Sequence, residues 1–325
     1  AIQSLGSGAT LTDTITVTSL DGTSHDITIT ITGTDEAAVI AGDDQGAVTE
    51  DASSPTLTDS GTLIITNQDA GEAGFVAGNI AGTYGSLSID AAGNWTYSAD
   101  TRQSAVQSLG AGVTLTDTVS VTSLDGTSHD IIVTITGVND ATLIAGDDQG
   151  AVTEDASSPT LADSGTLTIT DADAGEAGFV AGNVAGTYGS VSIDTAGNWT
   201  YSADNSQFPI QSLGAGATLI DTITVTSIDG TSHDISVTIT GINDAAVIAG
   251  DDTGAVTEDA SIPTLTDSGT LTITDADVGE SGFVAGSVAG IYGSVSIDTA
   301  GNWTYSADNG QFAIQSLGSG ATLTD

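Results

Sequence analysis

The chain has 325 residues, and its 43 acidic side chains face a single basic side chain, that of Arg102, for a formal net charge of −42. Such a surface repels nucleic acid and anionic membranes, so both are excluded as partners. Because cysteine is absent, disulfides and zinc-thiolate sites are excluded too, and no run of about 18 apolar residues predicts a membrane-spanning helix.

The sequence repeats with a period of 104 residues, the spacing that separates Trp95, Trp199 and Trp303. The opening thirteen residues return unchanged as residues 313–325. Each period has the size of an ordinary domain and can bury its own core. We therefore expect a fragment of a longer array, made of two partial repeats around two full ones. Their predicted bounds are 1–40, 41–144, 145–248 and 249–325.

The second full repeat shows the predicted elements in chain order. Val, Ile, Leu and Thr dominate while strong helix formers are rare, which favours strands. A turn-rich stretch over 157–165 leads into an alternating strand at 166–170, and 188–194 predicts another half-buried strand. The turn at 195–198 then reverses the chain into the strand at 199–201.

Two alternating runs, 221–227 and 232–241, close the repeat and flank Asp229-Gly230, a dipeptide that favours a tight hairpin. About seven short strands in roughly 100 residues predict an all-β chain of tandem antiparallel β-sandwiches of the immunoglobulin or cadherin kind. The tryptophan and the apolar alternants would fill the core. We expect a hydrogen bond within its own hairpin turn for the histidine that recurs as His25, His129 and His233.

Acidic side chains gather in three segments of each period: the exit of the last strand, the entry of the next repeat and its first loop. A sandwich places its entry, its exit and alternate loops at its ends, so these acids are expected to meet where two repeats join. Six to eight oxygen ligands suit calcium, whereas magnesium demands stricter octahedral geometry. The alternative reading is that the acids are solvated turn residues.

Ordered motifs over the whole chain resemble the VCBS repeats, cadherin-like modules found in tandem in very large secreted bacterial adhesins. The matching motifs are VTEDAS at 152–157, DADAGE at 171–176, the hairpin at 188–201, and TGVNDA or TGINDA at the close of a repeat. The resemblance implies a sandwich whose junctions hold calcium. The ligands it implies are Asn139 and Asp140 of the linker, Glu154 of the entry, and Asp171 and Asp173 of the loop, with their equivalents one period on.

Extended to every period, this pattern gives the complete set of candidate calcium ligands. They are Asp35, Glu36, Glu50, Asp51, Asp69, Glu72, Asn139, Asp140, Glu154, Asp155, Asp171, Asp173, Glu176, Asn243, Asp244, Glu258, Asp259, Asp275, Asp277 and Glu280. In the first period, Asp35-Glu36 replaces Asn-Asp and Asn67-Gln68-Asp69 replaces Asp-Ala-Asp, so a weaker or differently built site is expected. Ser104 stands where Phe208 and Phe312 recur, which predicts a looser local core.

These features favour a structural role without catalysis. The leading hypothesis is a calcium-stiffened extender of a secreted bacterial adhesin, located at the extracellular cell surface, serving adhesion and biofilm formation, with neighbouring repeats as its partners. One alternative is a subunit of a self-assembling extracellular filament of identical chains. Another is a carbohydrate-binding or hydrolytic module, which would need aromatic platforms and paired carboxylates.

Overall fold

The computed structural model describes residues 1–325 and confirms the predicted all-β class. The chain divides into two compact units. One comprises Ala1–Leu143, Ile169–Gly178 and Ser227–Thr231, and the other comprises Ile144–Thr168, Phe179–Thr226 and Ser232–Asp325. None of the helices is long and apolar enough to span a membrane.

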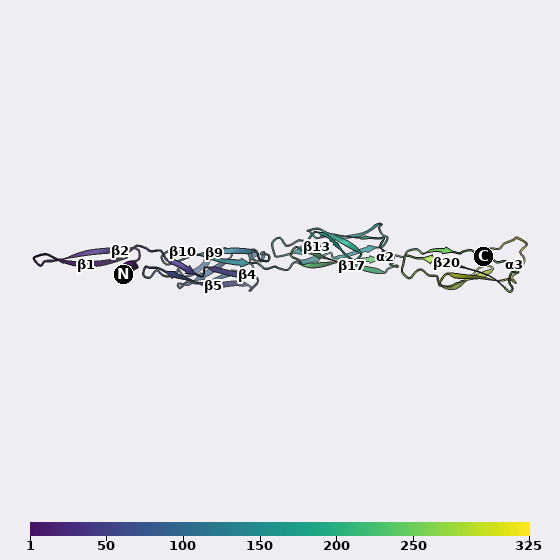
Figure 1. Ribbon diagram of the computed structural model, residues 1–325, viewed down its shortest axis with the longest axis horizontal. Coiled ribbons are helices and arrows are strands. Elements are labelled where there is room, and N and C mark those ends of the chain that lie inside the picture. The colour runs from purple at the N-terminus through teal and green to yellow at the C-terminus, as the bar shows by residue number, and fades with distance from the viewer. The chain divides into compact units, whose positions relative to one another are not determined.

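The first complete repeat has two sheets (Figure 1). The larger sheet has the order β3 (Val39–Gly42), β5 (Thr56–Thr66), β8 (Asn94–Asp100), β7 (Gly85–Ile89) and β6 (Gly78–Ala81). The smaller sheet has the order β4 (Gln45–Thr49), β10 (Ser128–Thr136) and β9 (Thr114–Thr122). A single helical turn, α1 (Ser104–Gln107), connects β8 to β9.

The second complete repeat has the same topology. Its larger sheet has the order β11 (Leu143–Gly146), β13 (Thr160–Thr170), β16 (Asn198–Asp204), β15 (Gly189–Ile193) and β14 (Gly182–Ala185). Its smaller sheet has the order β12 (Gln149–Thr153), β18 (Ser232–Thr240) and β17 (Thr218–Thr226). The short helix α2 (Phe208–Gln211) connects β16 to β17.

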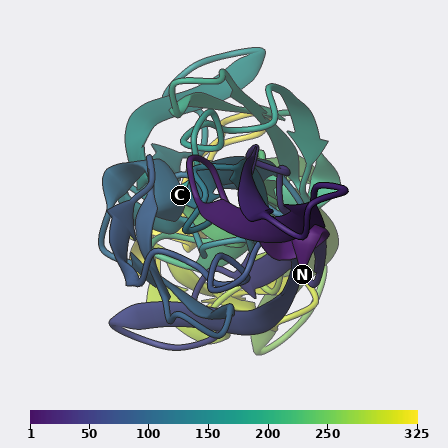
Figure 2. The ribbon, with the colours of Figure 1, turned by 90° about the vertical axis from the view of Figure 1, so that its left-hand side faces the viewer.

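Each end of the chain carries part of this architecture. At the N-terminus, η1 (Ile2–Ser4) precedes a two-stranded sheet of β1 (Thr10–Thr18) and β2 (Ser24–Thr32), drawn in purple in Figures 1 and 2. The C-terminal residues form one five-stranded sheet in the order β19 (Val247–Gly250), β20 (Thr264–Thr274), β23 (Asn302–Asp308), β22 (Gly293–Ile297) and β21 (Gly286–Ala289). Helix α3 (Phe312–Gln315) follows β23.

The core of a complete repeat lies between its two sheets, because alternate residues of each strand face inward. Trp95 and Leu87 of the larger sheet are 1% and 0% exposed, and Ile131 of the smaller sheet is 0% exposed. The indole Nε1 of Trp95 donates a hydrogen bond to the carbonyl oxygen of Asp43 at 2.7 Å, which satisfies its buried donor. The prediction that tryptophan and the apolar alternants fill the core is confirmed.

Three strand features differ from the sequence prediction. The stretch over 157–165 was predicted as a turn, but β13 begins at Thr160, and each complete repeat has eight strands rather than seven. In addition, β4 pairs with β10 in parallel, with Val48 opposite Ile135. Parallel partners need a long connection, and here it is the remainder of the repeat, so no local pattern announces the pairing.

The expected looser core at Ser104 is wrong. Phe208 and Phe312 are 74% and 87% exposed, so the side chain at this position points away from the core in every repeat that has it. Two residues further on, Val106 and Ile210 are 0% exposed and fill the core instead. In one short helical turn, residues two apart cannot face the same side.

The expected histidine contact is also wrong. Nε2 of His129 lies 3.2 Å from Oδ2 of Asp44, and His233 is paired with Asp148 at the same distance. The partner lies 85 residues earlier in the chain, just before the strand that pairs in parallel with the hairpin. The hairpin turn itself is held instead by Asp229, whose Oδ1 accepts the backbone N–H of Thr231 at 3.0 Å.

Candidate metal centre

Most of the candidate ligands fall into three acidic clusters, each of which lies within one compact unit. The first cluster comprises Asp35, Glu36, Asp69, Glu72 and Asp125. The second cluster comprises Glu50, Asp51, Asn139, Asp140, Asp171, Asp173, Glu176 and Asp229. The third cluster comprises Glu154, Asp155, Asn243, Asp244, Asp275, Asp277 and Glu280.

In the second cluster, the loop after β13 is folded around its own aspartates. Oδ1 of Asp171 accepts the backbone N–H of Asp173 at 2.9 Å, which turns the chain and directs the Asp173 side chain inward. Asp173 is only 2% exposed, and its Oδ2 accepts the backbone N–H of Asp140 at 2.8 Å. The loop of one repeat thus holds the linker that leads into that repeat.

The same loop also contacts the end of the preceding repeat. The backbone N–H of Ala174 donates a hydrogen bond to the carbonyl oxygen of Ser108 at 3.1 Å. The Glu176 carboxylate lies against Gly110 so closely that a Cβ at Gly110 would come within 2.6 Å of Oε1. Glycine at this position therefore allows the carboxylate of one repeat to approach the backbone of another.

Glu50, at the end of β4, contributes a buried carboxylate to the second cluster. It is 1% exposed, and it accepts hydrogen bonds from Nε2 of Gln107 at 3.1 Å and from the backbone N–H of Val138 at 3.4 Å. Burial raises the pKa of Glu50 to about 7, and the charges of Asp140 and Asp51 add to this rise. The cluster therefore resists ionisation of Glu50 as long as nothing compensates its negative charges.

Neighbouring carboxyl groups in the second cluster also have raised pKa values. Burial raises the pKa of Asp140, and the charges of Asp51 and Asp173 raise it further. Burial and the nearby charges of Asp173 and Asp171 likewise raise the pKa of Glu176. Each acid makes ionisation of the others less favourable, and the single arginine of the chain is bound to Asp100 at 2.9 Å, outside the cluster.

The donor set of the second cluster fits calcium. Asp140 Oδ2 and Asp173 Oδ1 are buried and have no hydrogen-bond partner. Unpartnered buried oxygens are rare in folded proteins and call for a compensating group. A hard cation with six to eight oxygen ligands would satisfy them, because carboxylate, amide and backbone oxygens are the ligands that calcium prefers. Asn139 is exposed, and its side-chain amide donates to the carbonyl oxygen of Asp140, which leaves its Oδ1 available as a ligand.

The third cluster repeats this geometry one period on. Asp277 Oδ2 accepts the backbone N–H of Asp244 at 2.9 Å, and Nε2 of Gln211 donates to Oε1 of Glu154 at 3.1 Å. Burial raises the pKa of Glu154, with the charge of Asp244 adding to the effect. Here too Asp244 Oδ2 and Asp277 Oδ1 are buried without a partner. Two independent copies of the site therefore carry the same unsatisfied oxygens.

The first cluster is built differently. Carboxylate oxygens of Asp35, Asp69 and Glu72 lie within 4.8 Å of one another. Asn67 replaces the first aspartate of the loop, and its Oδ1 accepts the backbone N–H of Asp69 at 2.8 Å, so the loop keeps its shape with one charge fewer. Glu36 donates its backbone N–H to Asp69 Oδ2 at 3.0 Å.

Glu258 and Asp259 repeat the positions of Glu154 and Asp155, and Asp259 is bound by Asn309 and Gln315 as Asp155 is bound by Asn205 and Gln211. Other contributors to the clusters were missed. The hairpin-turn aspartate joins the site, since Asp125 Oδ2 accepts the backbone N–H of Ala38 at 2.6 Å and Asp229 Oδ2 that of Thr142 at 3.2 Å. The Asp-Gly dipeptide recurs in every period, and this recurrence could have indicated a role in the cluster. Because the dipeptide also favours a tight hairpin, its sequence alone gave no reason to add the aspartate to the ligands.

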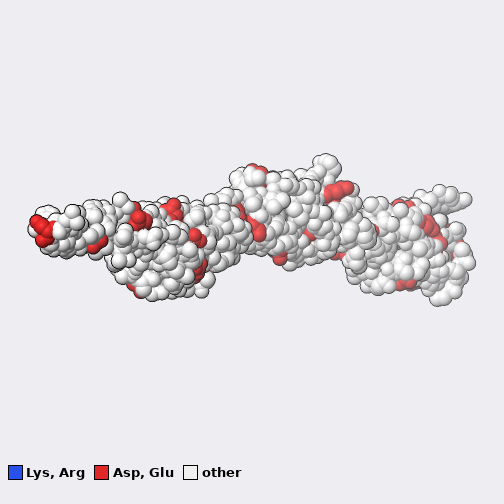
Figure 3. Space-filling model, turned by 60° about the vertical axis from the view of Figure 1, so that its left-hand side comes forward, with Lys and Arg blue, Asp and Glu red and all other residues white.

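Acidic side chains lie in separate groups on the face seen in Figure 3, and no lysine or arginine is visible there. Because the chain has one arginine and no lysine, solvent cations must balance these groups. The clusters therefore combine converging carboxylates, raised pKa values and unpartnered buried oxygens, an arrangement that can bind a divalent cation.

Comparison with known proteins identifies the repeats. The family described as bacterial cadherin-like domain matches residues 35–137 and 139–241. No curated protein matches the chain significantly.

Solved structures similar to the chain include protocadherin gamma B7 extracellular cadherin domains 1–4, at 12% identity and TM-score 0.41, over 89% of this chain and 72% of that one. A Ca²⁺-stabilized adhesin described as helping an Antarctic bacterium reach out and bind ice matches at 17% identity and TM-score 0.28, over 92% and 74%. Mouse clustered PcdhgC3 EC1-3 matches at 12% identity and TM-score 0.36, over 72% and 77%.

Proposed function

Because the chain belongs to the family of bacterial cadherin-like domains, we propose that it is the calcium-stiffened extender of a bacterial surface adhesin. It would act outside the cell, holding an adhesive part away from the surface in attachment and biofilm formation. The VCBS type of repeat is part of this proposal. One observation carries it: in the second and third clusters, two successive repeats and their linker surround buried carboxylate oxygens that have no partner.

The physical argument is thermodynamic linkage. A cation that binds the ordered junction, and not the disordered one, stabilises the ordered form by RT ln(1 + [L]/Kd), about 2.7 kcal/mol at a hundredfold excess over Kd. Without a cation, burial and the charges of neighbouring carboxylates raise the pKa values of Glu50, Asp140 and Glu176, so full ionisation of the junction is unfavourable. Calcium would therefore convert a repulsive junction into a rigid one.

Small-angle X-ray scattering of the full chain tests this proposal. Addition of calcium to the chelator-treated protein is expected to increase the maximum dimension of the protein and to narrow the range of conformations that it adopts. The variant Asp69→Asn, Asp173→Asn, Asp277→Asn, which removes the buried loop aspartate from each cluster, should lose most of this response because calcium loses a charged ligand. The matched control is Asp26→Asn, Asp130→Asn, Asp234→Asn, which removes the same charge from exposed strand positions.

Identical scattering profiles with calcium and with chelator would contradict the proposal. So would an equal response in the ligand variant and in its control, because the effect would then depend on net charge alone. Isothermal titration calorimetry of the same three proteins gives the number of bound ions independently of shape. Removal of the loop aspartates should reduce that number.

The alternative functions differ in their support. A carbohydrate-binding module would display its tryptophans, but Trp95 and Trp199 are both 1% exposed and Trp303 is 8% exposed. A filament of identical chains is the other alternative, and it requires contacts between copies of the chain.

A further inference from the structure

The first and second acidic clusters differ by an exchange of residue types between the linker and the loop. In the second cluster, the linker carries Asn139 and the first position of the loop carries Asp171. In the first cluster the two types have changed places, because Asp35 stands in the linker and Asn67 in the loop. One change adds a carboxylate and the other removes one, so the charge has moved from the loop to the linker.

The exchange leaves the number of acids in the cluster unchanged. The equivalent positions are Asp35, Glu36, Asn67, Asp69, Glu72 and Asp125 in the first cluster, and Asn139, Asp140, Asp171, Asp173, Glu176 and Asp229 in the second cluster. Each set has five carboxylates and one amide. Calcium affinity depends on the number of charged ligands, so a cation site is sensitive to this total, whereas solvated turn residues are not.

Asparagine at the loop position preserves the turn without a charge. Oδ1 of Asn67 accepts the backbone N–H of Asp69 at 2.8 Å, the contact that Oδ1 of Asp171 makes in the second cluster. Nδ2 of Asn67 donates a hydrogen bond to Oδ2 of Asp125 at 3.0 Å, which an ionised aspartate could not do. Asn67 therefore holds the loop and the hairpin-turn aspartate together, and the loop supplies one charge fewer to a cation.

At the linker position, the two residue types make different contacts. Nδ2 of Asn139 donates a hydrogen bond to the carbonyl oxygen of Asp140 at 2.8 Å. An ionised carboxylate has no donor, so Asp35 cannot make this bond. A carboxylate oxygen of Asp35 instead lies within 4.8 Å of carboxylate oxygens of Asp69 and Glu72. The linker carboxylate thus lies among the acids of the loop.

Asp35 also acts on the loop glutamate as Asp171 does one period on. Burial raises the pKa of Glu72, and the charge of Asp35 is among those that raise it further. Burial likewise raises the pKa of Glu176, and there the charge of Asp171 is among those that add to the rise. The carboxylate that acts on the glutamate therefore comes from the linker in one cluster and from the loop in the other.

Two buried oxygens mark the first cluster as a ligand site in its own right. Asp69 is 2% exposed, and its Oδ1 has no hydrogen-bond partner. Oε2 of Glu72 is also buried without a partner. Buried acceptors of this kind call for a compensating group. Both belong to the three acids whose carboxylates converge, which places the compensating group beside Asp35.

We propose that Asp35, Asp69 and Glu72 bind a divalent cation in the first cluster. The linker carboxylate of Asp35 there takes the role that the loop carboxylate of Asp171 has in the second cluster. The assignment rests on the proposed calcium function and adds a requirement to it. Each site needs one carboxylate from this pair of positions, and either position can supply it.

Calcium chemistry permits such a relocation. Calcium accepts six to eight oxygen ligands in flexible geometry, and so it tolerates the same charge arriving from a different side, which the stricter octahedral geometry of magnesium does not favour. The linker and the loop are also joined already, since Oδ2 of Asp69 accepts the backbone N–H of Glu36 at 3.0 Å. A carboxylate from either segment can therefore face the same cation.

Calcium titrations followed by hydrogen exchange with mass spectrometry test the assignment on the full chain. Amide protection of residues 34–39 reports the first cluster, and protection of residues 138–143 reports the second cluster. Each site therefore gives its own midpoint calcium concentration. Both linkers are expected to become protected as calcium is added to the chelator-treated protein.

In the second cluster, Asp171→Asn should raise the midpoint of residues 138–143 by roughly 10-fold or more, because the site loses one charged ligand. Addition of Asn139→Asp to this variant should return the midpoint to within about threefold of the original value, whereas Asn139→Asp on its own should change it by less than about threefold. Each substitution reproduces the residue of the first cluster, so the chain already contains a folded precedent for it.

In the first cluster, Asp35→Asn should raise the midpoint of residues 34–39 by roughly 10-fold. Addition of Asn67→Asp should recover most of that loss, because the loop then supplies the carboxylate. The matched control is Asp26→Asn, which removes the same charge from an exposed strand position and should leave both midpoints unchanged.

Three results would overturn the assignment. The first is calcium protection of residues 138–143 without protection of residues 34–39, which would leave the proposed calcium function standing and remove Asp35 from the ligands. The second is an effect of Asp35→Asn no larger than that of Asp26→Asn. The third is failure of Asn139→Asp to lower the midpoint of the Asp171→Asn protein. Absence of calcium protection in both linkers of the unchanged chain would overturn the assignment and the proposed function together.

Discussion

The first complete repeat and the C-terminal sheet have the same strand order, but their cores differ. Leu87 and Trp95 are 0% and 1% exposed in the complete repeat, whereas the corresponding Val295 and Trp303 are 37% and 8% exposed. The difference is the presence of β9 and β10, which cover the larger sheet of the complete repeat. A five-stranded sheet of this kind does not bury its own inner face. The closing hairpin completes the core, and it is the last element of the repeat to appear in the chain.

The strongest way to break this comparison is to remove the aspartate that ties the closing hairpin to the sheet. Asp117 of β9 is 0% exposed and accepts the backbone N–H groups of Thr83, Tyr84 and Gly85 and the hydroxyl of Tyr97. Asp117→Ala leaves these four converging donors without an acceptor in a buried site, and each orphaned donor costs on the order of 1–3 kcal/mol. We expect the free energy of unfolding of the first complete repeat to fall by about 4 kcal/mol. Hydrogen exchange measured by mass spectrometry would show faster exchange in β7, β8 and β9.

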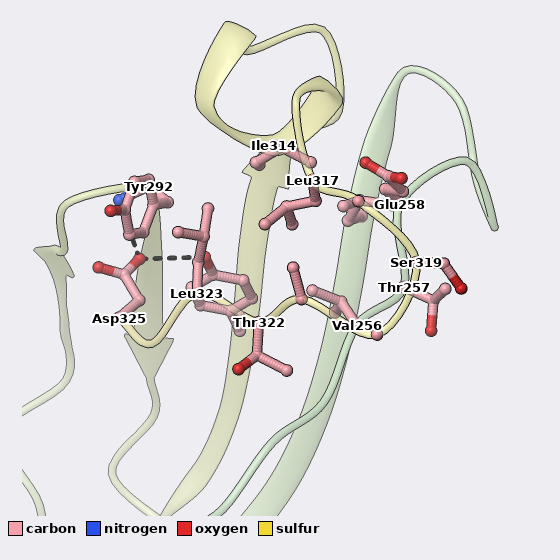
Figure 4. A pocket seen from close by; sticks show the side chains of 15 residues that line it. Val256, Thr257, Glu258, Tyr292, Ile314, Leu317, Ser319, Thr322, Leu323 and Asp325 are labelled. Carbon is pink, nitrogen blue, oxygen red and sulfur yellow. Dashed lines mark hydrogen bonds between the residues drawn. The ribbon is translucent and has the colours of Figure 1, made fainter.

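The matched variant is Asp325→Ala, which removes the same carboxylate from an exposed position, where it accepts the backbone N–H of Gly293 at 2.7 Å and the hydroxyl of Tyr305 at 3.0 Å (Figure 4). Asp325→Ala should lower the free energy of unfolding of the C-terminal sheet by only about 0.5 kcal/mol. Equal protection losses in the two regions would show that burial does not decide the strength of this contact. The hydrogen bonds themselves are consistent with a strong site, because burial alone would raise the pKa of Asp117, yet the bonds from Thr83 and Tyr97 outweigh it and hold the pKa below its usual range.

A smaller effect is expected from pH, and it distinguishes the junction that contains Glu50 from the C-terminal region. The pKa of Glu50 is raised from 4.5 to about 7 in the folded chain. The unfolded chain therefore releases this proton first, so the stability contributed by the neutral carboxyl is complete below pH 4.5 and is lost as pH rises to about 7. In chelator, the second cluster should be better protected from hydrogen exchange at pH 5 than at pH 8.

Calcium should reverse this dependence, since protons compete with the cation for Glu50. Glu50→Gln should remove most of the pH dependence in chelator, whereas Glu258→Gln, outside the three clusters, should leave it in place. If Glu50→Gln leaves the pH dependence of hydrogen-exchange protection in the second cluster unchanged, another titrating group is responsible for that dependence.

The smallest effect is expected at the position where the sequence prediction failed. Phe208→Ser reproduces the residue of the first complete repeat, and because Phe208 is 74% exposed, the change should alter stability by no more than about 0.5 kcal/mol. Ile210→Ala, two residues away and fully buried, should cost about 3 kcal/mol. Thermal unfolding of the two variants checks the order, and a larger loss for Phe208→Ser would mean that this side chain packs against the domain in solution.

Much of the fold followed from local patterns in the sequence. The period of 104 residues, the Asp229-Gly230 hairpin and the 188–201 hairpin were predicted because alternation and turn chemistry act over a few residues. The strand at 160–165 was missed because its serine, aspartate and glycine are typical of turns. In the structure, Asp163 sits in β13 and its Oδ2 accepts the backbone N–H of Ala151 at 2.7 Å, which gives a turn-forming residue a partner within the fold.

The sequence by itself determined the repeat, the strand class and the three acidic segments of each period, because composition and periodicity are carried by neighbouring residues. Only the tertiary structure decided which segments meet. The parallel pairing of β4 with β10, the contact of His129 with Asp44 and the entry of Asp229 into the acidic cluster each join residues 85 or more positions apart. Such contacts depend on how the larger sheet is closed by the final hairpin, and no local pattern records that closure.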